Sequence, residues 1–575
     1  MHDPAEYFRH PKTPLHRQYE ALRAYLLEEL PAIEVAHRFG YAPGYVRVLG
    51  TLFRQGKTED FFPELLPRKR RASKRQDFRK EIIELRKRGL SIYDISLKMD
   101  ANGMPASHQM IWMVLKEEGF ERLPKRTAAQ LKVVSKIHPP VSDVNELNLT
   151  SGRMVSCQAP LLLLFAPFLE RLGFSELVKK AGYRGSSMIP APAYLRSLLA
   201  LKLMPRARKN HVMSIAEDDG FGMFTGLNVM PKTTALSDYS YRTGPKPHRA
   251  ILEGIVRARD RMNAYPSHSF NLDFHIIRHY GETDYSSLEK DYVPRRSQSV
   301  PAVVTAFAQE WQSRELVYSH ANLLKRDKAD EVLRFVEYWQ KTTGKSPQEL
   351  VFDCHMTTHE GLAELDKGNI RFITLRERRA NEVARVAAVP KERWERVELD
   401  IEDRKYKTPL VLDELIELPG YDGNIRQISA IDLGREEPMF LLTNDNRRGP
   451  AALLTRYARR TLIENALGEQ VHFFHVDALS SSVRIKVDLD TVLSVIASGC
   501  YRWFAGQLKG FENATAAKLW DTFLNRHGTI LLTKDEIVLN VRRFSRAPVL
   551  LESQISNDKT KIPWLGDRTI RVEIK

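Results

Sequence analysis

The alternation of apolar and polar residues between 267 and 375 constrains the fold more than any other feature of the chain. From Phe270 onward every second side chain is apolar and shares one strand face, while Asn271, Asp273 and His275 share the other. The elements predicted to follow are strands at 301–307 and 315–319, a helix at 328–340, a strand at 350–353, a helix ending at Gly368 and a strand at 370–375. This order predicts an α/β sheet that starts with three consecutive strands.

Two acidic residues stand alone in these predicted strands. Asp273 lies in the first strand, Asp353 ends the strand at 350–353, and a third acid, Glu464, follows in a predicted helix at 454–465. In-line cleavage of a phosphodiester needs an activated nucleophile and a neutralised leaving oxygen, which two Mg²⁺ ions about 4 Å apart can supply. Because Mg²⁺ prefers oxygen ligands and keeps several waters, two or three carboxylates are enough to hold it. We therefore expect a divalent-metal site at these three acids.

The predicted helix at 454–465 also carries Tyr457 and Arg460. Their spacing from Glu464 places all three side chains on one helix face. An arginine and a tyrosine beside an acid suit contacts with DNA phosphates and with a displaced base. Taken singly, a strand aspartate is most often a solvent-facing carboxylate, and such a helix face is most often a surface ion pair. The conjunction of strands, acids and helix face is what indicates a site.

The charge balance indicates a polyanionic partner. The chain of 575 residues has 88 lysines and arginines against 72 aspartates and glutamates, a net charge of +16, and such an excess most often serves nucleic-acid binding. Cys157, Cys354 and Cys500 are too scattered for a disulfide framework or a zinc knuckle. The start of the chain has no signal-peptide pattern, and the longest apolar stretch, 159–166, is too short to span a bilayer. We expect a soluble, cytoplasmic protein of several domains without a membrane partner.

Residues 1–66 are predicted to form a DNA-binding helix-turn-helix module. Three short helices are predicted, at 15–30, at 32–39 and from Pro43, the last two separated by a turn at Gly40. The predicted buried stripe of the third helix consists of Val46, Leu49 and Phe53. Arg47 and Arg54 lie on its remaining faces, where they would contact DNA.

A strongly basic run at 67–75 precedes a second helical module at 76–126. Such a run is usually a solvated linker, but between helical modules it also suits an arm that lies along phosphates. The DNA-contacting residues predicted in this run are Arg68, Lys69, Arg70 and Arg71. In the second module a helix is predicted at 76–88, and Ser91 and Ser107 are predicted N-caps of helices at 92–99 and 108–118, which again resembles a helix-turn-helix.

Three segments of the chain resemble the catalytic motifs of the DDE transposases of bacterial insertion sequences. These segments are Asn271-Leu-Asp273-Phe-His, Val351-Phe-Asp353 and Tyr457-x-x-Arg460-x-x-x-Glu464. The chain resembles in particular the group of insertion sequence four and its relatives, which has this Tyr-Arg-Glu signature and a β-strand insertion before the glutamate. The resemblance covers roughly 267 to 510. Relatives often carry a lysine seven residues after the glutamate, where this chain has Val471, which puts in doubt the detailed contacts with end DNA.

The resemblance implies a ribonuclease H-like catalytic core, whose element order matches the predicted three strands followed by strand–helix alternation. It implies that Asp273, Asp353 and Glu464 bind two Mg²⁺, with Mn²⁺ as an alternative. They would activate water to nick the element ends and then activate the freed 3′-OH to attack target DNA. Tyr457 and Arg460 would hold DNA near the scissile phosphate.

The resemblance also implies partners and one aromatic contact. The partners are double-stranded DNA, both the terminal inverted repeats and the target, and a second copy of the chain in the end-paired complex. In relatives an aromatic of the insertion stacks on a flipped base during hairpin formation. Trp394 is the only tryptophan between 376 and 443 and is the candidate for this role, with ordinary packing as the alternative.

The predicted organisation is multidomain: α-helical helix-turn-helix modules precede an α/β ribonuclease H-like catalytic domain with a β-rich insertion. The remaining predicted boundaries are 127–154 for a linker, 155–265 for a helical domain, 266–375 and 444–510 for the catalytic core, 376–443 for the insertion and 511–575 for a C-terminal β-containing segment. Two rival interpretations stay open. One is a DNA-binding regulator or an inactive transposase derivative. The other is a structure-specific nuclease of the same fold, which would not need two sequence-reading modules.

Several other side chains have both a functional and a structural interpretation. His275 could support Asp273 or could simply pack on its strand. His472 and His475 have a spacing that a metal could use, but without a cysteine partner they indicate a structural role. If the helix at 454–465 were placed differently, the third acid could instead be Asp477, Asp488 or Asp490.

Overall fold

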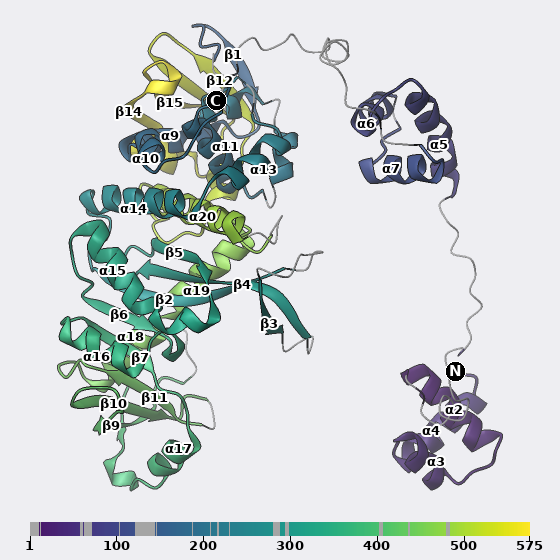
Figure 1. Cartoon of the computed structure of the whole chain (residues 1–575), viewed down its shortest axis with the longest axis vertical. Coiled ribbons are helices and arrows are strands. Elements are labelled where there is room, and N and C mark those ends of the chain that lie inside the picture. The colour runs from purple at the N-terminus through teal and green to yellow at the C-terminus, as the bar shows by residue number, and fades with distance from the viewer. Residues whose placement is uncertain are drawn as a thin grey trace. The chain divides into compact units, whose positions relative to one another are not determined.

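The computed structural model describes residues 11, 13–57, 61, 72–102, 104–120, 123, 144, 147–186, 188–206, 209–215, 218–228, 230–279, 288–293, 298–401, 406–434, 437–478 and 484–575. The chain is a mixed α/β multidomain protein with two compact units, Met1–Pro140 and Val141–Lys575 (Figure 1). No helix within the described ranges is long and apolar enough to cross a membrane. The predicted DNA-contacting residues Arg68, Lys69, Arg70 and Arg71 lie outside the described residues.

The first three helices surround a small core of their own. They are α2 (Pro14–Leu26), α3 (Ala32–Phe39) and α4 (Pro43–Arg54). The predicted turn is confirmed, because Gly40 ends α3 in the left-handed conformation with φ 69° and Pro43 begins α4. The first helix ends at Leu26 and not at the predicted residue 30, since the chain turns at Glu29, whose φ is 53°.

The buried face of α4 differs from the prediction at one position. Val46 and Leu49 are buried as predicted, but Phe53 is 49% exposed. Gly50 takes the inward position instead and lies against Tyr25 of α2, where a Cβ atom would come within 2.7 Å of the ring. The exposed residues of α4 include the predicted DNA-contacting residues, Arg47 and Arg54.

A second group of three helices follows, with its core centred on Ile95 and Ile111. Its helices are α5 (Ala72–Lys87), α6 (Ile92–Ala101) and α7 (His108–Glu117). Both predicted N-caps are confirmed. Ser91 forms a capping box with Asp94 at the start of α6, and Ser107 accepts a hydrogen bond from a backbone N–H in the first turn of α7. Because α5 already begins at Ala72, residues 72–75 of the predicted basic linker are helical.

The larger unit opens with a strand that the prediction missed. β1 (Met154–Cys157) pairs antiparallel with β12 (Gly528–Leu532). The segment predicted as a helical domain at 155–265 therefore starts inside a sheet that it shares with the C-terminal segment. Its helices are η2 (Pro160–Phe165), α9 (Ala166–Arg171), α10 (Phe174–Lys180), α11 (Ala191–Leu203), η3 (Lys209–Ser214), α12 (Asp219–Thr225), α13 (Thr233–Arg242) and α14 (Pro245–Arg261).

The central feature of this unit is a ten-stranded sheet with the order β3-β4-β2-β6-β7-β11-β10-β9-β8, in which β5 also pairs with β4. Its first strands are β2 (Ser269–Arg278), β3 (Glu289–Val293), β4 (Gln298–Glu310), β5 (Leu316–Leu323), β6 (Glu349–Phe352) and β7 (Arg371–Leu375). All except β3 were predicted. β3 lies between β2 and β4, so four strands precede α15 where three were expected. β2 is antiparallel to β4 and parallel to β6, and β6 is parallel to β7.

The two faces of β2 have different surroundings. On one face Phe270 packs against Phe335 and Trp339 of α15 (Glu331–Thr343), with ring centroids 5.1 and 4.5 Å apart. Another helix on the sheet is α16 (His359–Lys367). The opposite face of β2 carries Asn271 and Asp273 and contacts the helices that follow the sheet. One strand thus separates an aromatic core from a polar face.

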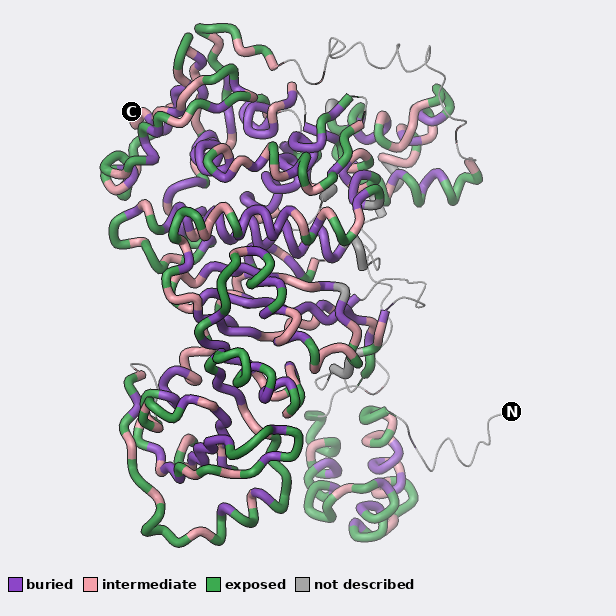
Figure 2. Tube along the Cα trace, turned by 60° about the vertical axis from the view of Figure 1, so that its left-hand side comes forward, coloured by how far each residue is buried: buried purple, intermediate pink, exposed green. Residues whose placement is uncertain are grey.

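The predicted β-rich insertion at 376–443 continues the same sheet. Its strands are β8 (Glu395–Arg396), β9 (Leu410–Glu417), β10 (Asn424–Ile431) and β11 (Met439–Thr443), and its helices are α17 (Ala380–Ala387) and η8 (Lys391–Arg393). β11 pairs antiparallel with β7, and the others extend outward from it. After the sheet come α18 (Pro450–Ala458), α19 (Thr461–His472) and α20 (Arg484–Gly506). Buried residues are concentrated along α20 and the strands it covers (Figure 2).

A five-stranded sheet with the order β1-β12-β13-β15-β14 completes the unit. Its C-terminal elements are α21 (Ala516–Leu519), the π-helix η9 (Trp520–Leu524), β13 (Glu536–Val541), α22 (Ala547–Glu552), β14 (Asn557–Ile562) and β15 (Arg568–Ile574). The prediction of a β-containing segment at 511–575 is confirmed, and the long helix α20 precedes it.

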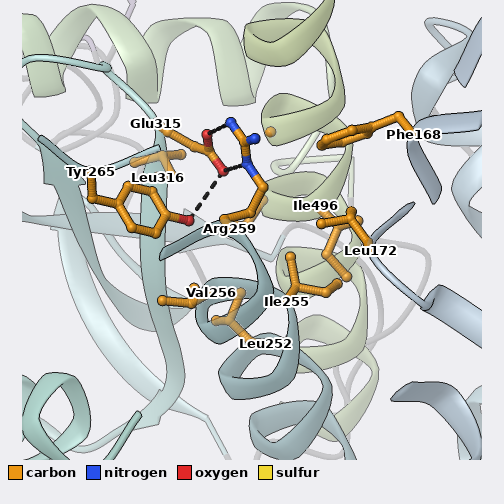
Figure 3. Close-up of a pocket in the computed structure, with 12 residues that line it drawn as sticks. Phe168, Leu172, Leu252, Ile255, Val256, Arg259, Tyr265, Glu315, Leu316 and Ile496 are labelled. Atoms are coloured by element: carbon orange, nitrogen blue, oxygen red, sulfur yellow. Dashed lines mark hydrogen bonds and ion pairs between the residues drawn. The ribbon is translucent and has the colours of Figure 1, made fainter. Parts of the chain in front are cut away.

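A buried ion pair joins α14 to the start of β5. Arg259 Nη2 lies 2.7 Å from Glu315 Oε2, and the hydroxyl of Tyr265 donates to Glu315 Oε1 at 3.2 Å. These side chains line a small cavity together with apolar residues such as Phe168 and Ile496 (Figure 3). The cavity lies where α14, β5 and α20 meet, so the ion pair ties the helical segment to the edge of the large sheet.

Candidate active site

The pairing of β2 with β6 brings the two predicted aspartates together. The parallel ladder ends with Asn271 opposite Val351. The same register continued by two residues sets Asp273 opposite Asp353, which follows the last residue of β6. The ladder itself stops at Asn271 and Val351, and Asp273 and Asp353, 80 positions apart in sequence (353 − 273), each lie two residues beyond it.

The third acid, Glu464, lies on a helix whose bounds differ from the prediction. A single helix was expected from 454 to 465, but α18 ends at Ala458 and α19 begins at Thr461. The helix tightens at this joint, since the N–H of Arg460 donates to Tyr457 O and that of Ile463 donates to Arg460 O, each three residues back. Glu464 consequently lies in the first turn of α19, where the positive end of the helix dipole favours a carboxylate.

The guanidinium of Arg460 holds two of the three predicted acids. Its Nη1 lies 3.0 Å from Asp273 Oδ2, and its Nη2 lies 2.9 Å from Glu464 Oε1. Arg460 and Asp273 are 13% and 19% exposed, whereas Glu464 is 50% exposed. Because both carboxylates contact one planar group, acids on β2 and α19 face the same point, at the edge of solvent.

The charge of Asp353 also affects the pKa values of Arg460 and Tyr457. Burial lowers the pKa of Arg460, but the charges around it, chiefly Asp273 and also Glu464 and Asp353, raise that pKa above its ordinary value. Burial raises the pKa of Tyr457 to about 12; Arg460 opposes this rise and Asp353 adds to it. Tyr457 therefore keeps its proton at neutral pH and can donate a hydrogen bond. Arg460 is thus the residue that interacts with each of the other four predicted residues of the site.

The surroundings of Asp273 disfavour the ionised form of its carboxyl group. Burial raises the pKa of its carboxyl group, and the charge of Glu464 raises it further, whereas Arg460 and a hydrogen bond from the N–H of Phe274 lower it. The net result is a pKa above the ordinary value. A buried carboxyl group whose pKa is raised in part by a neighbouring acid is a candidate for binding an additional positive charge.

Next to the site lies a second ion pair, Arg456 with Glu349, which the sequence analysis did not identify. Arg456 on α18 is 7% exposed; its Nη1 donates to Asn271 Oδ1 at 2.8 Å and its Nε donates to Glu349 Oε1 at 2.7 Å. Its guanidinium also lies over the ring of Trp311, 4.4 Å from the centroid. This side chain fixes α18 against β2 two residues before Asp273. Only its position next to Tyr457 could have drawn attention to it in the sequence.

The alternative acids are engaged elsewhere. Asp488 lies 2.9 Å from His248 Nδ1, and Asp490 lies 2.7 Å from the amine of Lys202. Asp477 contacts His275 Nε2 at 2.6 Å, so His275 pairs with an acid outside the predicted triad. Of the four candidates for the third acid, Glu464 is the one that contacts the arginine bound to Asp273.

The remaining predicted residues lie apart from this arrangement. Trp394 is half-buried and packs against the small core of Val386, Leu412 and Phe440, as in the packing alternative. His472 and His475 belong to no group of potential metal ligands among the described residues. Arg47 and Arg54 belong to the other compact unit, Met1–Pro140.

The donor set at the site suits a hard cation. Ligand atoms of Asp353, Cys354 and His355 lie within 4.8 Å of one another. However, burial, with a further contribution from Asp353, raises the pKa of the Cys354 thiol to about 12. The thiolate that a soft metal requires is therefore disfavoured. The carboxylate oxygens of Asp273, Asp353 and Glu464 do not all lie within 4.8 Å of one another in this arrangement. They are nevertheless the kind of ligand that Mg²⁺ and Mn²⁺ prefer.

Comparisons with known proteins add no family assignment. The sequence matches no protein-family model and no curated protein. The function of the site has to be argued from its own geometry.

Proposed function

We propose that this chain is a DNA transposase that cuts and joins DNA strands through Asp273, Asp353 and Glu464. The observation that carries the proposal is that Asp273 of β2 and Glu464 of α19 contact the guanidinium of Arg460, while Asp353 directly follows the strand next to β2. Like charges brought together at a half-buried position are costly unless cations compensate them. A group of carboxylates that faces solvent and is backed by a fixed arginine is a suitable place for divalent ions and a phosphodiester.

The strand arrangement supports a ribonuclease H-like core. The strands run in the order β5-β4-β2-β6-β7, with β4 antiparallel to both β5 and β2, and with β6 and β7 parallel to β2. β2, β4 and β5 come first in the chain, with the additional strand β3 between β2 and β4. β6 and β7 are separated by the helix α16, as the resemblance implies. In this proposal Asp273 occupies the central strand, next to the strand that leads to Asp353.

The two helical groups of the first compact unit support DNA recognition. In α3 and α4 a tight glycine turn separates two short helices, and the second of them exposes Arg47 and Arg54. We propose that these groups are helix-turn-helix modules that read the terminal repeats. A cytoplasmic location, with the protein on nucleoid DNA, and a paired complex of two copies on two DNA ends belong to the same proposal.

The residues of the site have separate tasks in this mechanism. Asp273, Asp353 and Glu464 would hold Mg²⁺, which when bound activates the attacking oxygen and neutralises the leaving one. Arg460 would contact a phosphate oxygen beside the scissile bond, and the protonated hydroxyl of Tyr457 would donate a hydrogen bond to the DNA. Arg456 keeps α18 in place against Asn271. The attacking group is water in the first step and the freed 3′-OH in the second.

The proposal is tested by incubating the full chain with linear duplexes that contain the DNA flanking its coding segment. With Mg²⁺ we expect nicks at defined positions and joined products, and with EDTA we expect binding alone. Binding without any cleavage would favour a DNA-binding regulator. Equal cutting of four-way junctions whatever the flanking sequence would favour a structure-specific nuclease.

A further inference from the structure

A basic cavity lies at one end of the five-stranded sheet, apart from the candidate active site. It has a volume of about 690 Å³ and is formed where β12 begins and where β13 and β15 end. Its lining residues come from 525–529, 540–544 and Lys575. The first two segments belong to the antiparallel pair β12 and β13, and the parallel pairing of β13 with β15 brings Lys575 beside them.

The lining is cationic and contains no acidic residue. The groups that are or can become positively charged are Arg526, His527, Arg542, Arg543 and Lys575. Arg542 and Arg543 are exposed, and neither has an ion pair with any residue in the described part of the chain. Lys575 has one carboxylate neighbour, Glu573, at 3.5 Å. Adjacent cations without counter-charges repel one another, and a bound anion relieves this repulsion.

Backbone hydrogen bonds join the strand ends that carry these cations. The N–H of Arg543 donates to Lys575 O at 2.7 Å, and the N–H of Lys575 donates to Val541 O at 3.0 Å. At the floor of the cavity Gly528 lies so close to Asn540 that a Cβ atom would overlap its carbonyl oxygen. The end of β13, with Arg542 and Arg543, is therefore held close both to the end of β15 and to the start of β12.

Arg526 is anchored from the other side. Its Nη2 donates to Thr522 O at 2.8 Å and to Asp521 O at 3.1 Å, and its guanidinium lies 4.8 Å from the ring centroid of Phe544. Both carbonyls belong to the π-helix η9, an uncommon element that often occurs at functional sites. The guanidinium thus keeps its place, and no carboxylate among the described residues forms an ion pair with it.

We propose that this cavity binds the phosphate backbone of duplex DNA, as a contact separate from the candidate active site. The open mouth and the exposed row of Arg542 and Arg543 suit an extended polyanion, whose successive phosphates can reach several cations. Binding here would add affinity without reading sequence, because phosphates are the same at every base pair. The inference rests on the proposed function, since the DNA bound at this cavity would be the DNA that the acids of the same compact unit cut.

The test compares the salt dependence of DNA binding for two double variants of the full chain. One is Arg542→Gln with Arg543→Gln, in the cavity. The control is Arg546→Gln with Lys561→Gln, two exposed cations outside the lining that remove the same charge. Dissociation constants for a 30-base-pair duplex of random sequence are measured in EDTA, so that no strand is cut. Unchanged melting temperatures establish that each variant is folded.

Two lost phosphate contacts should reduce the slope of log Kd against log salt by about 1.8, at about 0.9 per contact. The cavity variant should show this decrease and bind at least about tenfold more weakly at low salt, and the control should keep the wild-type slope. Equal slopes for both variants, or an equal loss in both, would overturn the inference. Either result leaves the Mg²⁺-dependent cleavage assay to decide the proposed function independently.

Discussion

Replacing Asp353 by asparagine is expected to lower Mg²⁺-dependent strand cleavage by at least about 10³-fold while leaving the Kd for DNA unchanged. The reason is that Asp353 directly follows the last residue of β6, where its charge acts on Arg460 and Tyr457. Asparagine keeps the size of the side chain but loses the charge that would hold a divalent ion. The measurement is single-turnover nicking of flanking DNA, together with binding of the same duplex in EDTA.

The matched control is Asp477→Asn. Asp477 is an exposed acid that pairs with His275 on the same strand as Asp273, so its loss changes the local charge equally without touching the predicted triad. We expect it to retain cleavage within a fewfold. Wild-type cleavage by the Asp353 variant would contradict the account, and so would a loss of DNA binding as large as the loss of cleavage.

Asp273→Asn should remove cleavage as well, but without a cost in stability. Because the folded-state pKa of Asp273 is raised, its ionised form is less favourable in the folded protein than in the unfolded chain. This penalty is absent below the unfolded pKa, appears as the pH rises through the folded pKa, and persists at neutral pH. The asparagine variant should therefore melt at the same or a higher temperature than wild type at pH 7, and the difference should shrink toward about pH 4. A clearly lower melting temperature at pH 7 would contradict the electrostatic account of Asp273.

Removing Arg259 is the second change with a large expected effect, this time on stability. Arg259 and Glu315 are 12% and 4% exposed and form a two-point ion pair. Arg259→Ala would leave the Glu315 carboxylate buried with only the hydroxyl of Tyr265 as a partner (Figure 3). Breaking a buried pair in this way costs about 3–5 kcal/mol. We expect a loss of this size in the free energy of unfolding, measured by urea titration.

Two further variants separate the charge effect from simple truncation. Arg261→Ala, an exposed arginine on the same helix, should change stability by less than about 0.5 kcal/mol. The double variant Arg259→Met with Glu315→Leu removes both charges and should recover most of the loss, because replacing a buried pair by apolar side chains is often neutral. A double variant no more stable than Arg259→Ala would indicate that packing, rather than the unpaired charge, dominates.

Local patterns predicted the strands and caps well. The alternation around Phe270 gave β2 and the face of Asp273, and the serines at 91 and 107 cap their helices as expected. These features depend on nearest neighbours and on burial of one face, which a sequence displays directly. The same reasoning placed Glu464 near Asp273, although it missed the joint between α18 and α19.

Features that depend on distant partners could not be predicted. Phe53 fits a helical stripe, yet the chain turns Gly50 inward because Tyr25 fills the space beside it. Arg456 contacts Glu349, which lies 107 residues earlier, and no local pattern specifies that pair. The strand β1 needs β12, more than 370 residues later, as its partner. Long-range ion pairs and sheet closure emerge only once the whole unit has folded.

The measurement that tests the central claim most directly is the binding of Mn²⁺ to the full chain without DNA. Binding is detected as a loss of the free-ion signal in electron paramagnetic resonance. It needs no knowledge of end sequences. The account predicts saturable binding that Asp273→Asn and Asp353→Asn each weaken by at least about tenfold, while Asp477→Asn leaves it unchanged. Mn²⁺ affinity that is the same in wild type and in both triad variants would contradict the assignment of these acids as a metal site.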